Sequence, residues 1–369
     1  MSRYHALVGL LLCGAAQAAG PTLDERRAAA QAAAEGADCS RLDFYWEIGD
    51  ALGNVRSGNG PGGLAGFKVK ATDSGYIASS GKWLFGAYAA EKRNGVFTAA
   101  DLPYLTMKSG YHSLGDCNFA LTPAAQRTVG KCGAAANNPL TAADGPHDEN
   151  GQTVPGSFHY EPGHFEALAA SDASLNLTAA TAVQIGPRIA DSLKISRLTY
   201  GGLVLAGQAQ IDTVNYALFL RKLLDGSLRL GRLLGSHQVC TSTTTSGLNQ
   251  TPLYCNRNAA RDDRTSFTPP LQAALDSTPT LPDGTTALPN GEPWRYSLAH
   301  FVEKDGSFSS AGQFGFYPWI DASKTWYGVL ARYDTVGGTA TQIVTYQSSL
   351  LCGRAIRNAW LHAVPAPAP

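Results

Sequence analysis

The sequence predicts an α/β (α+β) fold in which the two ends of the chain build one body and the middle forms an inserted, mostly helical lobe. Strand-like and helix-like segments occur before residue 110 and again after residue 290. Residues 111–290 between them hold longer polar loops. With 369 residues, 44% of them hydrophobic, the chain can bury a large core. A functional pocket is expected at the seam between body and lobe.

The first part of the body is expected over residues 19–110. Residues 22–36 are rich in alanine with acids near their start, which predicts a helix. The aromatic and β-branched run Asp43–Gly49 predicts a strand, and the glycines of residues 56–66 predict a loop. The apolar spacing from Ser79 to Lys92 predicts a buried helix.

The inserted lobe is expected over residues 111–290. Apolar residues from Ile211 to Leu224 fall near one stripe and predict a helix. Residues 241–290 are rich in Thr, Ser, Pro and Asn, so they are expected to form a long loop.

The second part of the body is expected over residues 291–362, followed by a Pro/Ala tail at 363–369. Two strand-like runs, Gly312–Ile320 and Thr325–Tyr333, are joined by a turn sequence. Residues Tyr346–Trp360 are expected to form a closing helix.

The N-terminus has the features of a signal peptide over residues 1–18. Arg3 precedes the apolar run Ala6–Cys13, and Ala16–Ala18 has the small-x-small pattern of a cleavage site. The run is too short to span a bilayer, so we expect no stable membrane anchor. Leu12 is bulky where a lipobox needs a small residue, which argues against lipidation of Cys13. A secreted or periplasmic protein is therefore expected.

Removal of the signal peptide leaves six cysteines, an even number that suggests disulfides in an exported chain. Two pairs are close in sequence and would each close a loop of about 15 residues. The expected pairs are Cys117 with Cys132, Cys240 with Cys255 and, by elimination, Cys39 with Cys352. A zinc site is the alternative, but no Cys-x-x-Cys occurs and no histidine lies at ligand spacing.

Charge and missing motifs exclude several classes of protein. Lys plus Arg and Asp plus Glu both number 29, so the zero net charge gives no field to attract nucleic acid or anionic lipid. Gly-x-Ser-x-Gly, His-Glu-x-x-His and a glycine-rich phosphate loop are absent. We expect no cofactor and no metal, and a monomer that acts on a small ester, amide or peptide.

The sequence Ser79-Ser80-Gly81-Lys82 is the only Ser-x-x-Lys in the chain. Residues three apart share one face of a helix, so the Lys82 amine can reach the Ser79 hydroxyl. A buried lysine can take the proton of a serine and activate it as a nucleophile. The alternative is an exposed lysine one turn after a serine at a helix start.

Several segments resemble motifs of the serine β-lactamase and penicillin-binding-protein-like hydrolases, in particular class C β-lactamases and related esterases. Gly75–Ala89 resembles their nucleophile helix, and Leu105–Tyr111 resembles the "LLTHTSG" segment beyond it. Phe158–Leu168 resembles "F-x-Y-S-N-x-G-Y-x-L-L", with Tyr160 in place of the motif tyrosine. Tyr200–Asp212 resembles a glycine-rich segment that serves as a packing landmark in the family.

The resemblance implies an antiparallel sheet flanked by helices with an inserted helical lobe. It also implies that Ser79 is the nucleophile, that Lys82 is its partner, and that Tyr160 acts as base to Ser79 and as acid to the leaving group. The sequence departs from the motif at Pro162, which stands near the place of the family's substrate-binding asparagine.

Ser310–Asp321 resembles the third family motif in its esterase form, with matching glycines at Gly312 and Gly315. Ser310 replaces the cation that binds a substrate carboxylate in β-lactamases, which implies neutral esters or amides as substrates. Ser310→Lys is then expected to raise β-lactam turnover. The resemblance also implies that an N–H near Gln313 joins the Ser79 N–H as an oxyanion hole. Two alternatives stay open: a β-lactamase or D-Ala-D-Ala peptidase, and a non-catalytic sensor that keeps the fold.

Overall fold

The computed structural model describes residues 20–40, 43–61, 68–111, 127–132, 158, 160, 162–240, 294–334 and 339–363. The expected signal peptide and the expected loop over 241–290 lie outside these residues.

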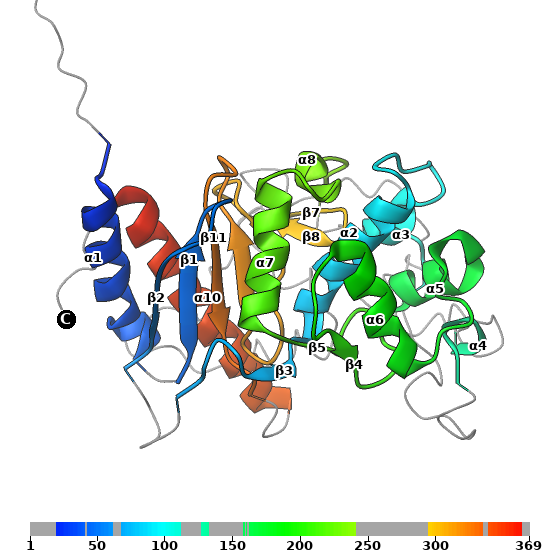
Figure 1. The fold of residues 1–369 in the computed structure, drawn as a ribbon, viewed down its shortest axis with the longest axis horizontal. Coiled ribbons are helices and arrows are strands. Elements are labelled where there is room, and N and C mark those ends of the chain that lie inside the picture. Colours follow the sequence, from blue (N-terminus) through cyan, green and yellow to red (C-terminus); the bar gives the residue numbers. More distant parts are fainter. Residues whose placement is uncertain are drawn as a thin grey trace, which may run out of the picture.

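An eight-stranded antiparallel sheet forms the centre of the protein, in the order β2-β1-β11-β10-β9-β8-β7-β6 (Figure 1). Its strands are β1 (Tyr45–Gly49), β2 (Asn54–Asn59), β6 (Val239–Cys240), β7 (Arg295–Ser297), β8 (His300–Val302), β9 (Phe308–Ser309), β10 (Tyr317–Ile320) and β11 (Tyr327–Ala331). Tyr45 lies opposite Ala331, and Gly49 lies opposite Tyr327. The first strands of the chain therefore join its last strands directly.

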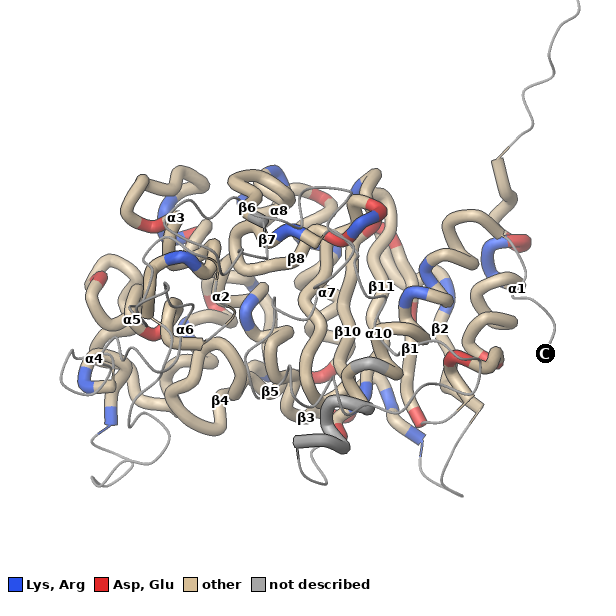
Figure 2. Tube along the Cα trace, turned by 180° about the vertical axis from the view of Figure 1, so that it is seen from behind, with Lys and Arg blue, Asp and Glu red and all other residues tan. Residues whose placement is uncertain are grey.

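Helices cover both faces of this sheet. Helix α7 (Thr213–Leu224) lies on one face, and α10 (Thr339–His362) lies on the other, as the opposite views of Figures 1 and 2 show. Helix α1 (Leu23–Ala34) begins with a capping box between Thr22 and Glu25 and packs its buried alanines on α10. The predicted antiparallel sheet flanked by helices is confirmed.

The other side of the molecule is mostly helical. It contains α2 (Gly81–Lys92), α3 (Leu102–Leu105), α4 (Val129–Cys132), α5 (Gly163–Ser171), α6 (Ala182–Leu193) and α8 (Leu230–Leu233), with short 3-10 helices η2 (Ala78–Ser80) and η5 (Ala173–Leu175). Another 3-10 helix, η1 (Ala37–Cys39), packs on α1 and α10 instead. A second antiparallel sheet has the order β3-β5-β4, formed by β3 (Ser74–Tyr76), β5 (Ala209–Asp212) and β4 (Thr199–Tyr200). Helix α2 is buried along most of its length, so it is the central helix of this side.

Three expected elements differ from the structure. Ile211 lies in β5, and α7 begins only after it, at Thr213. A loop was expected over residues 56–66 because of their glycines, but residues 54–59 form strand β2. The strand expected from Gly312 begins at Tyr317, because the residues before it form a turn against η2.

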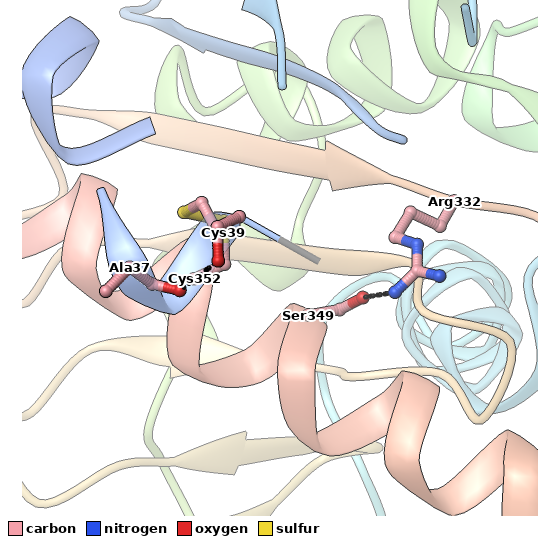
Figure 3. The surroundings of a disulfide bond; sticks show 6 residues. Ala37, Cys39, Arg332, Ser349 and Cys352 are labelled. Atoms are coloured by element: carbon pink, nitrogen blue, oxygen red, sulfur yellow. Dashed lines mark hydrogen bonds between the residues drawn. A yellow bond between two sulfur atoms is a disulfide. The ribbon is translucent and has the colours of Figure 1, made fainter. Parts of the chain in front are cut away.

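A disulfide joins Cys39 on η1 to Cys352 on α10 and confirms one expected pair (Figure 3). Cys132 is also disulfide-bonded. Cys117, its expected partner, lies outside the described residues, and so does Cys255, the expected partner of Cys240.

Within the described residues, no helix combines the length and the apolar character that crossing a membrane requires. Figure 2 shows basic and acidic residues interspersed over the described elements.

Candidate active site

Ser79 lies in η2, at the point where the chain enters α2. Ser79 is half-buried, whereas Ser80 and Lys82 on either side of Gly81 are buried. Ala78 has a φ of +45°, a left-handed backbone conformation that costs a non-glycine residue about 1 kcal/mol. The N–H of Ile77 donates to Ala209 O at 3.0 Å, which extends the pairing of β3 with β5. The turn before Ser79 is thus held in a strained conformation by the small sheet.

Lys82 lies directly behind the Ser79 hydroxyl. Its Nζ donates to Ser79 Oγ at 2.8 Å and to the carbonyl of Ala206 at 3.1 Å. Only 4% of Lys82 is exposed, so the alternative of an exposed lysine is wrong. The Ser-x-x-Lys spacing places the two side chains in direct contact over one helical turn.

Tyr160 contacts the same lysine through its ring. The Lys82 Nζ lies 4.6 Å from the centre of the Tyr160 ring, within the range of a cation–π interaction. The ring also packs on Phe301 and Tyr296, with centroid distances of 5.1 and 5.8 Å. The structure therefore brings Tyr160 to the site, while its role as a base stays a prediction.

The segment between β9 and β10 packs against the Ser79 turn. Ser80 Oγ donates to Ser310 O at 2.6 Å and to Phe316 O at 3.0 Å. Ser310 Oγ donates to Ser79 O at 3.0 Å. A Cβ at Gly312 would lie 2.1 Å from Ile77 O, so only glycine allows this close approach. These contacts join the two segments directly around Ser79.

Ser79 and Gln313, which are expected to supply the N–H groups of the oxyanion hole, lie in these two segments, and this role stays a prediction. Within the described residues, the Ser79 N–H makes no backbone hydrogen bond. Gln313 follows Gly312 and is half-buried. Ser310 is only 2% exposed, and its hydroxyl is used to hold the Ser79 carbonyl. Its burial argues against direct contact between Ser310 and a substrate.

Sequence reasoning missed several residues that build this site. Tyr216 on α7 donates its hydroxyl to Ser80 O at 2.9 Å. The segment Tyr200–Asp212 was expected to serve packing only, but the Ala206 carbonyl accepts from Lys82. Glu166 on α5 is fully buried and accepts a hydrogen bond from the Ala206 N–H at 3.2 Å. A single carboxylate within an apolar helical stretch was the signal for Glu166, whereas a backbone carbonyl leaves no signal in a sequence.

No group of three or more His, Cys, Asp or Glu side chains in the described part of the chain is placed to hold a metal ion. His164 on α5 is buried, and its Nδ1 lies 2.6 Å from Ser109 Oγ.

Models of known protein families and curated proteins give no match to this chain. Solved structures do match. A putative beta-lactamase from Bacteroides dorei has 12% identity and a TM-score of 0.49, over 87% of this chain and 94% of that one. A penicillin-binding protein homologue from Pyrococcus abyssi, described as octameric, has 12% identity and a TM-score of 0.47, over 90% and 76%.

A mutant simvastatin synthase from Aspergillus terreus also matches, with 12% identity and a TM-score of 0.45, over 90% of this chain and 98% of that one. The chain resembles serine β-lactamases and penicillin-binding proteins. This is the family whose motifs the sequence resembles.

Proposed function

We propose that the protein is an exported serine hydrolase that acts on an ester or amide substrate through an acyl-enzyme, with Ser79 as its nucleophile. The observation that carries this proposal is the 2.8 Å contact between Lys82 Nζ and Ser79 Oγ. The lysine is buried and the serine is half-buried, so the serine can be reached from outside while its base stays shielded from water. The disulfide between Cys39 and Cys352 supports export, because disulfides persist in oxidising compartments.

In the first step, the neutral amine of Lys82 takes the proton of the Ser79 hydroxyl, and Oγ attacks the carbonyl carbon of the substrate. The negative charge on the carbonyl oxygen is stabilised by the N–H groups of Ser79 and Gln313. The C–O or C–N bond to the leaving group then breaks, and the leaving group receives the proton from the Lys82 ammonium, either directly or through Tyr160, which gives up its own proton and takes the one from Lys82. Water attacks the acyl-enzyme in the second step, releases the acid and restores Ser79.

The proposed substrates are neutral esters or amides rather than β-lactams, which are anionic. In the motif that the sequence resembles, Ser310 takes the sequence position of the β-lactamase cation, and this buried serine brings no charge to the site. Lys324 is another cation of this side of the sheet, but its Nζ donates to Leu234 O at 3.3 Å and lies over the Phe308 ring. Without a charge-assisted hydrogen bond to its carboxylate, a β-lactam should bind about ten- to a hundredfold more weakly. A β-lactamase or D-Ala-D-Ala peptidase is therefore the second candidate.

The test combines active-site labelling with a substrate panel. A fluorophosphonate probe should label the wild type at Ser79 and should not label Ser79→Ala, because only an activated serine reacts. A panel of p-nitrophenyl esters, anilides and a chromogenic cephalosporin should show hydrolysis of an ester or anilide, lost roughly a thousandfold or more in Ser79→Ala. The exposed Ser227 supplies the matched control, Ser227→Ala, with unchanged labelling.

Three results would contradict the proposal in different ways. If Ser79→Ala hydrolysed esters at a rate within tenfold of wild type, Ser79 would not be the nucleophile. Faster turnover of the cephalosporin than of any ester would favour the β-lactamase. Folded protein with neither labelling nor turnover would favour the non-catalytic sensor.

A further inference from the structure

A buried carboxylate lies behind the Ser79–Lys82 pair. Glu166 projects from α5 and has no exposed surface. Its Oε1 accepts the Ala206 N–H at 3.2 Å, whereas its Oε2 has no hydrogen-bond partner within the described part of the chain. An isolated buried carboxylate is costly, because burial penalises the charged form and leaves the oxygen unsolvated. The hydrolytic chemistry proposed above makes no use of this group.

Ala206 connects Glu166 to Lys82. The N–H of Ala206 is held by Glu166, and its carbonyl accepts from the Lys82 Nζ at 3.1 Å. Glu166 therefore fixes the peptide segment that orients the lysine toward Ser79. The two side chains also interact through their charges: burial raises the pKa of Glu166 to about 8, and the nearby Lys82 charge opposes this rise.

We propose that Glu166 is a positioning residue for Lys82, which fixes the Ala206 carbonyl and shares one proton with the lysine. The inference rests on the proposed function. With one proton between them, the pair exists either as Lys82 ammonium with Glu166 carboxylate or as neutral amine with carboxylic acid. The second form carries no charge into the buried site, and it is the form in which Lys82 can accept the Ser79 proton.

Other groups near α5 could also affect the titration of Lys82 and Glu166, so the test needs a control for them. The charges of Lys82 on α2 and Glu166 interact, as do those of Tyr200 on β4 and Glu166. Further titratable or charged groups lie on or next to α5 and the helices packed against it: His164, Tyr160, Asp101, which is paired with Arg93, and the exposed Lys131 on α4. The Tyr200 hydroxyl is buried, and it also lacks a hydrogen-bond partner among the described residues. Tyr200→Phe therefore changes the same surroundings without changing a charge.

The test measures Lys82 directly by NMR titration of the lysine Nζ with isotope-labelled lysine, with its signal assigned through its loss in Lys82→Arg. Glu166→Gln keeps an oxygen that can accept the Ala206 N–H but removes the carboxylate. Without an anionic partner, the Lys82 ammonium becomes less favourable. The midpoint of its titration is expected to fall by about one pH unit, and the acid limb of kcat/KM for the best p-nitrophenyl ester is expected to fall with it.

Matched variants separate charge from packing. Glu166→Met is an unbranched apolar replacement that should give the same shift if Glu166→Gln does not fold. Tyr200→Phe should leave the Lys82 midpoint within about 0.3 pH unit of wild type, well below the shift that a lost neighbouring charge produces. An unchanged Lys82 midpoint in folded Glu166→Gln and Glu166→Met would overturn the inference, whatever the activity. A lowered midpoint in a protein without Ser79-dependent hydrolysis would uphold the coupling and refute only the proposed function.

Discussion

The stability of the protein should depend on the charge of His300 below neutral pH. This side chain on β8 is fully buried and stacks on Trp83, with 5.5 Å between ring centroids. The Gly235 N–H donates to His300 Nε2 at 3.2 Å, and Nδ1 lies 2.9 Å from Leu298 O. A backbone N–H can only donate and a carbonyl can only accept, so the ring is neutral with its proton on Nδ1. Protonation of Nε2 would place two N–H groups against each other.

The size of the effect follows from the shift of the His300 pKa. Burial lowers the pKa of His300 from 6.5 to about 4 in the folded protein. The difference corresponds to about 3 kcal/mol at 1.36 kcal/mol per pH unit. Because the folded-state pKa is the lower one, this contribution is fully present above pH 6.5 and is lost as the pH falls toward 4. About 1.4 kcal/mol should be lost by pH 5.5.

The perturbation is His300→Gln, which keeps an acceptor for Gly235 but cannot titrate. Urea unfolding followed by tryptophan fluorescence gives the free energy of unfolding of both proteins at pH 7.5, 6.5, 5.5 and 4.5. The variant is expected to be less stable at pH 7.5, because it loses the stacking on Trp83. The difference between wild type and variant should then shrink by about 2 to 3 kcal/mol toward pH 4.5. Parallel curves for the two proteins over this range would refute the argument.

Three further predictions concern the disulfide and Ser310. The double variant Cys39→Ala/Cys352→Ala should lose about 2–4 kcal/mol of stability in urea unfolding, since the bond closes a very long loop; an equal midpoint for wild type and variant without reductant would contradict this. Ser310→Ala should lower ester turnover about five- to tenfold, because one hydrogen bond that holds the Ser79 carbonyl is lost, with Ser227→Ala as the unchanged control. Ser310→Lys should lower the melting temperature and give no gain in cephalosporin turnover, because a lysine at this buried position cannot reach a substrate. An increased kcat/KM for cephalosporin would instead support the expectation from the sequence that a cation here raises β-lactam turnover.

Motif spacing and the cysteine count predicted part of the site and part of the fold. The three-residue spacing of Ser79 and Lys82 placed them on one helical turn, and the structure has them in contact. The even cysteine count led to the pair Cys39 and Cys352, which the structure confirms. The antiparallel sheet and its flanking helices were also expected, through the motifs that resemble the family.

Contacts between distant segments were not predictable from local patterns. The apolar run from Gly312 suggested a strand, but Gly315 has a φ of +85° and its N–H donates to Gly312 O, so the chain turns first. The direction of the Ser310 side chain depends on the carbonyl of Ser79, far away in sequence. Glu166 showed only as one acid in an apolar helix, and its relation to Lys82 depends on Ala206. The domain boundaries and the roles of Tyr160 and Gln313 stay predictions.

The pairing of β1 with β11 constrains the order in which the protein can fold. Strand β1 carries Trp46 and Ile48, which are buried only when the last strands are in place. Until then, the β1–β2 hairpin presents an open edge to which other chains can add. The disulfide between Cys39 and Cys352 spans 313 residues of sequence, so it can form only after this closure. Cys39 therefore lacks its native partner through most of folding, and a refolding experiment under oxidising conditions should trap early species in which Cys39 is paired with another cysteine.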